Sequence, residues 1–216
     1  LKFPHHENEI AQAKAHDNNK IANVWMHNGF VNFGNEKMSK SLGNVILMKD
    51  VVKEYGGEAF RLMLLACHYR APASFSVDTI KEAQTKYNQL TMSLRKSAVA
   101  LQLAGIEIDG LKPNNEDAFL DAMCDDLNTP NALAVLYEEN KALNQFLRSR
   151  PLDLEKLGES FAKVRSYCEV LGINVKIPHL TEEDKALYKE YDEAKANKDF
   201  AKSDELRARM IERGIF

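Results

Sequence analysis

Apolar side chains recur at helical spacing along most of the chain after residue 76. The first stripe consists of Ile80, Ala83, Tyr87, Leu90, Leu94, Val99, Leu101 and Leu103, flanked by polar residues. Because residues three and four apart share one face of an α-helix, this pattern predicts one long helix over about 76–104. Gly105 ends it, and Gly110 and Pro113 indicate that a loop follows.

Shorter helical patterns fill the rest of the chain. We expect helices over residues 116–126, 129–148, 153–171, 182–196 and 199–213. Thr129 precedes Pro130, which is typical of a capping hydroxyl before a proline at the first helical position. Thr181 and Asp184 have the spacing of a capping box. The last two helices are short and highly charged, so we expect them to form an antiparallel hairpin.

The first 75 residues have a mixed pattern. They predict a short helix after the run that begins at His5, a strand over about 24–33, a glycine-bearing turn, and short helices near 49–55 and 57–66. The chain is therefore predicted to be mainly α, with a mixed α/β opening segment.

Composition narrows the class of protein. The 216 residues are 44% hydrophobic and 28% charged, which is ordinary for a globular chain and argues against a disordered or membrane-spanning one. Three cysteines that are far apart argue against a disulfide scaffold or a self-contained zinc finger. The chain opens without Met, signal peptide or membrane segment, so we expect a cytoplasmic protein, no membrane partner, and a piece of a longer chain.

Charge is distributed unevenly. Residues 36–96 carry 10 basic and 6 acidic side chains, whereas residues 97–216 carry 16 basic and 23 acidic ones, a net of −7. A protein that binds nucleic acid without specificity would be basic over a whole face. Any nucleic acid must therefore be bound locally.

The pentapeptide Lys37-Met-Ser-Lys-Ser41 is the first candidate for chemistry. Two lysines three residues apart, with serine hydroxyls between and beside them, suit the binding of a polyphosphate. A lysine charge there would stabilise attack on the α-phosphate of ATP more in the transition state than in the ground state. The alternative for a generic pair of lysines is a solvated basic loop.

Several motifs together resemble the cysteinyl-tRNA synthetase family of class I aminoacyl-tRNA synthetases. They are Phe3 to Gln12, Trp25 to Gly29, Glu36 to Asn44 with its KMSKS sequence, Asp125 to Pro130, and Ala132 to Val135. The resemblance implies the C-terminal end of a class I nucleotide-binding α/β domain followed by an antiparallel helical bundle. It divides the chain into residues 1–75 with the KMSKS loop, a tRNA-binding bundle over 76–180, and a hairpin over 181–216.

The resemblance also implies a reaction and its residues. ATP and cysteine form cysteinyl-adenylate, from which cysteine passes to its tRNA. Lys40 and, secondarily, Lys37 are the expected catalytic residues, and Lys40, Ser39 and Ser41 are expected to bind ATP. We expect a monomer whose partners are cysteine and cysteine tRNA.

His5 and Glu9 are the candidate metal ligands. On a helix, positions i and i+4 share a face, so both side chains could reach one zinc ion, although a capped, solvated helix start is the commoner explanation of such a pair. In the resembled family, zinc is bound by this His and this Glu together with two cysteines earlier in the chain, and it selects the substrate thiol. Cys67, Cys124 and Cys168 lie downstream, in expected helices, and are predicted to be small buried hydrophobes.

Other side chains have two readings each. Trp25 and His27 either line a substrate pocket or pack in the strand. Arg70 either meets tRNA phosphate or, more commonly, complements the dipole at the end of a helix. The cations of the terminal hairpin alternate with acids, which favours a salt-bridged solvent face; they are Lys195, Lys198, Lys202, Arg207, Arg209 and Arg213.

The resembled enzymes carry a second ATP motif, His-Ile-Gly-His, that these residues lack. We therefore expect the 216-residue polypeptide alone to be inactive and its zinc site incomplete. Two alternatives remain: a related cysteine ligase of mycothiol synthesis, which shares the KMSKS and zinc elements, and a noncatalytic helical module that binds RNA or protein.

Overall fold

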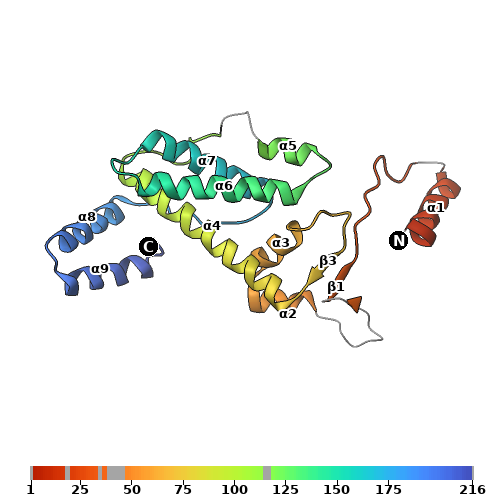
Figure 1. The fold of residues 1–216 in the computed structure, drawn as a ribbon, viewed down its shortest axis with the longest axis horizontal. Coiled ribbons are helices and arrows are strands. Elements are labelled where there is room, and N and C mark those ends of the chain that lie inside the picture. Colours follow the sequence, from red (N-terminus) through yellow and green to blue (C-terminus); the bar gives the residue numbers. More distant parts are fainter. Residues whose placement is uncertain (1, 18–19, 34–35, 38–46, 114–117, 216) are drawn as a thin grey trace.

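The computed structural model describes residues 2–17, 20–33, 36–37, 47–113 and 118–215. The chain is mainly helical and elongated, with a helical bundle and hairpin at one end and a small sheet and an N-terminal helix at the other (Figure 1). None of the helices in these ranges has the combined length and apolar character that a membrane span requires.

The longest helix, α4, connects the two ends of the molecule. The elements of the bundle are α4 (Val77–Leu103), α5 (Ala118–Cys124), α6 (Thr129–Arg148) and α7 (Leu154–Val170). Leu90, Leu94 and Leu101 of α4 are fully buried against Leu136 and Phe161 of its neighbours. Most of the predicted apolar stripe therefore forms the core face of α4, whereas Leu103 at its end is exposed.

The segment before α4 contains short helices and a small sheet, and two of its helices pack on α4. Its elements are an irregular π-helical turn η1 (Lys2–His6), α1 (Glu7–Asp17), β1 (Val31–Phe33), β2 (Glu36–Lys37), α2 (Met48–Tyr55), α3 (Gly57–Leu65) and β3 (Ala73–Phe75). Leu62 of α3 and Phe75 of β3 belong to the same hydrophobic cluster as the bundle. In the sheet, β1 lies between β2, to which it is antiparallel, and β3, to which it is parallel.

The terminal hairpin has a hydrophobic core of its own. Its helices are α8 (Glu182–Ala196) and α9 (Phe200–Glu212). Leu187, Leu206 and Met210 are buried in a cluster separate from that of the bundle. The segment that leads into the hairpin is tied to α4: the Gln102 side chain donates to the carbonyl of Pro178 (2.9 Å) and accepts from the amide of Leu180 (2.8 Å).

Most sequence-based helix predictions are confirmed to within a few residues. The predicted capping box is confirmed, since the Thr181 hydroxyl accepts from the amide of Asp184 and the Asp184 carboxylate accepts from that of Thr181. The cap of α6 was predicted wrongly: the side chain of Asn128 accepts from the amide of Asn131, and Thr129 is already helical.

The predicted strand over 24–33 is also too long. Only Val31–Phe33 pairs with neighbouring strands, and the residues before it run as an extended segment outside the sheet. Strand β3, the parallel partner, is three residues long and pairs only with positions 31–33. An alternating apolar pattern predicts extended backbone, but only a partner of matching length makes it a strand.

Candidate functional site

Strand β2 leads into the lysine-rich pentapeptide. Lys37 is its last residue and pairs with Asn32 of β1, and the next described helix is α2. Ser39, Lys40 and Ser41 lie outside the described residues, as does the side chain of Lys37. Their expected contacts with ATP remain predictions. The structure shows that the pentapeptide begins in strand β2, at the edge of the sheet.

A glycine brings the segment before β1 against the turn after α3. The Gly29 amide donates to the carbonyl of Tyr69 (2.7 Å), and the Ala73 amide donates to that of Phe30 (2.8 Å). A Cβ placed on Gly29 would lie 2.1 Å from the carbonyl oxygen of Ala71. Only glycine fits this approach, which explains the last residue of the Trp25–Gly29 motif.

The candidate metal ligands lie at the start of the chain. His5 belongs to η1 and Glu9 to α1, and both side chains are exposed. Because α1 begins at Glu7, the two residues do not share one regular helix as the i, i+4 argument assumed.

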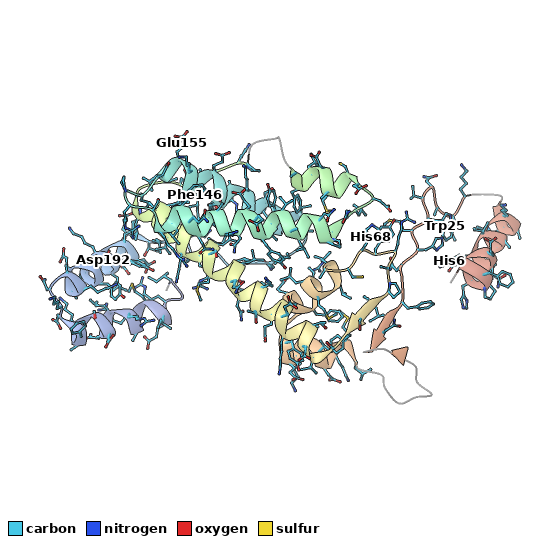
Figure 2. All side chains as sticks on the ribbon, in the orientation of Figure 1. His6, Trp25, His68, Phe146, Glu155 and Asp192 are labelled. Atoms are coloured by element: carbon cyan, nitrogen blue, oxygen red, sulfur yellow. The ribbon has the colours of Figure 1, made fainter. Side chains whose placement is uncertain are left out.

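His6, next to the candidate ligand, is the centre of an aromatic cluster. Its ring lies 5.4 Å from that of Trp25 and 5.1 Å from that of His27, centroid to centroid (Figure 2). Its Nδ1 atom is buried without a hydrogen-bond partner. Trp25 and His27 therefore pack against His6 from the extended segment rather than from a strand.

Zinc in a structural site takes four ligands. In the described part of the chain, no group of three His, Cys, Asp or Glu side chains is placed to hold a metal ion. His5 and Glu9 are thus at most two of the ligands, and the described residues alone do not fit a zinc ion.

Three consecutive residues after α3 converge on one carboxylate. Arg70 donates to both oxygens of Asp126, from Nε at 2.6 Å and from an Nη at 3.1 Å, and the Tyr69 hydroxyl donates to Oδ1 at 2.7 Å. His68 Nε2 lies 3.1 Å from the backbone oxygen of Asp126. These contacts, which we call the Asp126 clamp, join the α3–β3 turn to the α5–α6 turn.

The clamp holds an unusual backbone. Asp126 and Leu127 have φ values of 54° and 55°, in the left-handed region that side chains other than glycine rarely adopt. Hydrogen bonds from Arg70 and then Tyr69 lower the pKa of Asp126 to about 2. The guanidinium of Arg70 is engaged by this carboxylate, five residues beyond the end of α3, so its expected role at a helix terminus is wrong.

A cavity of about 360 Å3 lies beside the clamp. Its walls include Met26 from the extended segment and Val31 from β1, Leu65 from the end of α3, and Tyr69 and Leu127 from the two clamped turns. The motifs around Trp25, Arg70 and Asp125 were each visible in the sequence. Their contact in the fold could not be predicted, because no local feature of one motif indicates which other motif it contacts.

The three cysteines differ in how deeply they are buried. Cys168 is buried in α7, as predicted, and burial raises the pKa of its thiol to about 12. Cys124, at the end of α5, is exposed, so its predicted burial is wrong. Cys67 is half-buried and lies after α3 rather than within it.

The hairpin cations have different surroundings. Arg213 pairs with Glu183 (3.2 Å) and Asp184 (2.6 Å), and Lys195 lies 5.2 Å from the ring centre of Tyr191. Arg207 also has an interaction partner. Lys198, Lys202 and Arg209 form no ion pair with acids in the described part of the chain. The expected salt-bridged face is thus confirmed at Arg213, whereas Lys198, Lys202 and Arg209 do not fit it.

Comparison with known proteins finds similarity in two regions of the chain. Residues 1–85 match the catalytic domain of class I (C) tRNA synthetases, and residues 118–176 match the DALR domain. The chain is 37% identical over 224 aligned positions to proteins named cysteine–tRNA ligase from Staphylococcus aureus strains JH9 and Newman. The match covers 100% of the chain and 48% of each relative, so the chain spans about half the length of these relatives.

Proposed function

We infer from these matches that the chain belongs to the cysteine–tRNA ligase family, and we propose that the whole protein joins cysteine to its tRNA at the expense of ATP. In the first step a carboxylate oxygen of cysteine attacks the α-phosphate of ATP, and pyrophosphate leaves. In the second, a ribose hydroxyl at the end of the tRNA attacks the carbonyl carbon of the adenylate, and AMP leaves. The proposal is supported by the pentapeptide Lys37–Ser41, which falls inside the region matching the catalytic domain.

We propose that Lys40 stabilises the charge that grows on the departing pyrophosphate, and that Lys37 assists it. Ser39 and Ser41 would donate hydrogen bonds to phosphate oxygens. A lysine ammonium is a point charge on a flexible stem, which suits a group that must follow the phosphates as the bond breaks. The position between β2 and α2 supports this role, because both flanking elements are anchored in the fold.

His5 and Glu9 would supply two zinc ligands in the whole protein, and the other two would come from elsewhere. Zinc favours a thiolate ligand over a hydroxyl, so such a site would discriminate cysteine from serine. No step of the proposed reaction depends on it here.

The family assignment also supports a division of labour along the chain. We propose that residues 1–75 complete the catalytic domain, that 76–180 form the tRNA-binding bundle, and that 181–216 form an appended hairpin. The separate hydrophobic cluster of α8 and α9 supports the last boundary. We expect the protein to act as a monomer in the cytoplasm.

The decisive experiment is Lys40→Ala in the full-length protein. Cysteine-dependent ATP–pyrophosphate exchange should fall by at least about 100-fold, while ATP binding weakens by less than about tenfold, because the lysine acts on the transition state. Lys53→Ala, which removes an exposed lysine from the neighbouring helix α2, is the matched control and should leave both values unchanged. Equal losses of exchange and ATP binding would make Lys40 a binding residue only. Transfer of cysteine to an amino sugar instead of tRNA would contradict the proposed function.

A further inference from the structure

The Asp126 clamp joins two regions of the chain that match different families. On one side is the turn between α3 and β3, which carries residues 68–70 and lies within the region 1–85 that matches the catalytic domain. On the other is the turn between α5 and α6, which carries Asp126 and lies within the region 118–176 that matches the DALR domain. The clamp is therefore a direct polar contact between these two regions.

The turn after α3 is in turn bonded to the strand that leads to the lysine-rich pentapeptide. The Tyr69 carbonyl accepts from the amide of Gly29 (2.7 Å), and the Ala73 amide donates to the carbonyl of Phe30 (2.8 Å). Strand β3 pairs with β1, and β1 pairs with β2, whose last residue is Lys37. A continuous set of backbone hydrogen bonds thus connects the clamped turn to the strand in which the pentapeptide begins.

The turn between α5 and α6 has a strained backbone at the clamp. Asp126 and Leu127 are successive left-handed residues, and neither is glycine. Such conformations persist where the surrounding contacts hold them, and they are concentrated at functional sites. Leu127 lines the cavity beside the clamp together with Met26 and Val31. The strained turn therefore brings an apolar side chain against the segment that forms β1.

Stability alone gives a weak reason for this arrangement. The side chains of Arg70 and Asp126 are 62% and 48% exposed, and an exposed ion pair contributes little because water solvates the separated charges as well. The start of α3 has its own tie to the segment after α7, since the Asn174 amide donates to the Glu58 carboxylate (3.1 Å). Loss of the clamp would free the turn after α3 without detaching the helix.

We propose that the Asp126 clamp positions the two regions for the transfer step. It would fix the sheet that leads to the pentapeptide relative to the helical bundle, so that the ribose hydroxyl of a tRNA held by the bundle reaches the carbonyl carbon of the adenylate. Arg70 and Asp126 are positioning residues in this reaction, and they touch neither substrate. Small misplacements of reacting groups lower a rate steeply. The inference rests on the proposed function, which supplies both the adenylate and the tRNA.

The first test is Asp126→Gly in the full-length protein. Glycine adopts the left-handed backbone readily, so this variant removes the carboxylate without adding strain. Single-turnover transfer of cysteine from the preformed adenylate to saturating cysteine tRNA should slow by at least about tenfold. Cysteine-dependent ATP–pyrophosphate exchange without tRNA, and the dissociation constant of the tRNA, should each change by less than about twofold, because neither requires the hydroxyl to reach the adenylate.

Lys198→Gly is the matched control. Lys198 is exposed and has a φ of 56° in the turn between α8 and α9, so the variant makes the same kind of substitution at a left-handed position outside the clamp. It should leave the transfer rate unchanged. Urea midpoints of both variants show that each is folded under the assay conditions.

Substitutions of the donor show whether the contact itself is responsible. Arg70→Ala should slow transfer as Asp126→Gly does, and the double variant should be no slower than the slower single one, because both changes remove the same contact. Arg70→Lys should restore part of the rate, since an ammonium can donate to one carboxylate oxygen but lacks the paired donors of a guanidinium. Fully additive losses, or no recovery with lysine, would contradict a role for this contact.

The outcomes separate the two proposals. If the wild-type protein charges cysteine tRNA but Asp126→Gly and Lys198→Gly transfer cysteine at equal rates, the clamp proposal is overturned and the proposed function stands. Equal losses of exchange and transfer in Asp126→Gly would show a general structural role and would also overturn it. If the wild-type protein does not charge cysteine tRNA, the proposed function fails, and the clamp proposal fails with it.

Discussion

Asp126 joins two turns of the chain, and it lies 56 residues after Arg70, from which it accepts a hydrogen bond. Its carboxylate accepts from a guanidinium and a phenol hydroxyl, and its own backbone is left-handed. A carboxylate with this many donors resists protonation, since each hydrogen bond favours the charged form. At the residue scale, this side chain links the turn between α3 and β3 to the turn between α5 and α6.

The clamp should make stability depend on pH. The pKa of Asp126 is lowered from 3.8 to about 2 in the folded protein, so its contribution is present above pH 4 and is lost as pH falls toward 2. We expect Asp126→Asn to lower the urea midpoint at pH 7 and the difference from wild type to shrink steadily between pH 4 and pH 2. Asp121→Asn, which changes an exposed acid in α5, controls for the loss of charge. A difference that is constant over this pH range would show that the ion pair adds no stability.

Thiol reactivity should follow burial at the residue scale. The thiolate is the reactive form, and Cys168 is buried with its pKa raised to about 12, whereas Cys124 is exposed. In a titration with an aromatic disulfide reagent, Cys124 should react first and Cys168 only after unfolding. Cys124→Ser should abolish the fast phase, and Cys168→Ala should leave it intact. A fast phase that survives Cys124→Ser would contradict the assignment.

At the element scale, α8 is stabilised at its start by reciprocal hydrogen bonds. The Thr181 hydroxyl and the Asp184 carboxylate each cap the backbone amide of the other, and Arg213 at the end of α9 lies 2.6 Å from the same carboxylate. The capping box thus serves both helices, because it positions the acid that the second helix contacts. The sequence showed the box but not this second use.

Removing the cap should weaken the hairpin selectively. We expect Thr181→Ala to cost about 1 kcal/mol, the usual value of an N-cap side chain. Hydrogen exchange should accelerate in α8 and α9, while α4, α6 and α7 are unaffected because their core is a separate cluster. Thr85→Ala, at an exposed threonine within α4, is the control. Equal acceleration throughout the chain would show that hairpin and bundle unfold together.

Across the whole molecule, cations that form no ion pair with a described acid lie both on the helical bundle and in the hairpin. On the bundle, Lys96 of α4 and Arg148 of α6 line one polar cavity. In the hairpin, Lys198 lies in the turn between α8 and α9, and Lys202 and Arg209 lie in α9. An acidic bundle with a few local phosphate contacts should show a shallow dependence of tRNA affinity on salt.

We expect Lys202→Glu and Arg209→Glu to change tRNA affinity in the full-length protein by less than threefold. With about four phosphate contacts, the slope of log K against log salt should be no steeper than about −4. Binding should be measured by fluorescence anisotropy at several salt concentrations. A slope equivalent to six or more contacts, or a tenfold effect of either reversal, would assign the hairpin a direct role in binding tRNA.

Features that depend on neighbours within one or two helical turns could be predicted from the sequence. Helical periodicity and end residues located α4, α6, α7 and the hairpin closely, because an amphipathic stripe and its caps are local properties. The pentapeptide Lys37–Ser41 and its accompanying motifs indicated the family, which the sequence matches support. The N-cap of α6 is Asn128 and not the neighbouring Thr129, as was expected. Local signals therefore locate this helix end only to within one residue.

Contacts between residues far apart in the sequence are visible only in the folded chain. Strand β1 is short because its partner β3 is short, and Arg70 is engaged because Asp126 lies across from it. The cavity beside the Asp126 clamp exists because the extended segment, β1 and the two clamped turns meet there. These features depend on the distance between segments far apart in the chain, and local propensity carries no information about that distance.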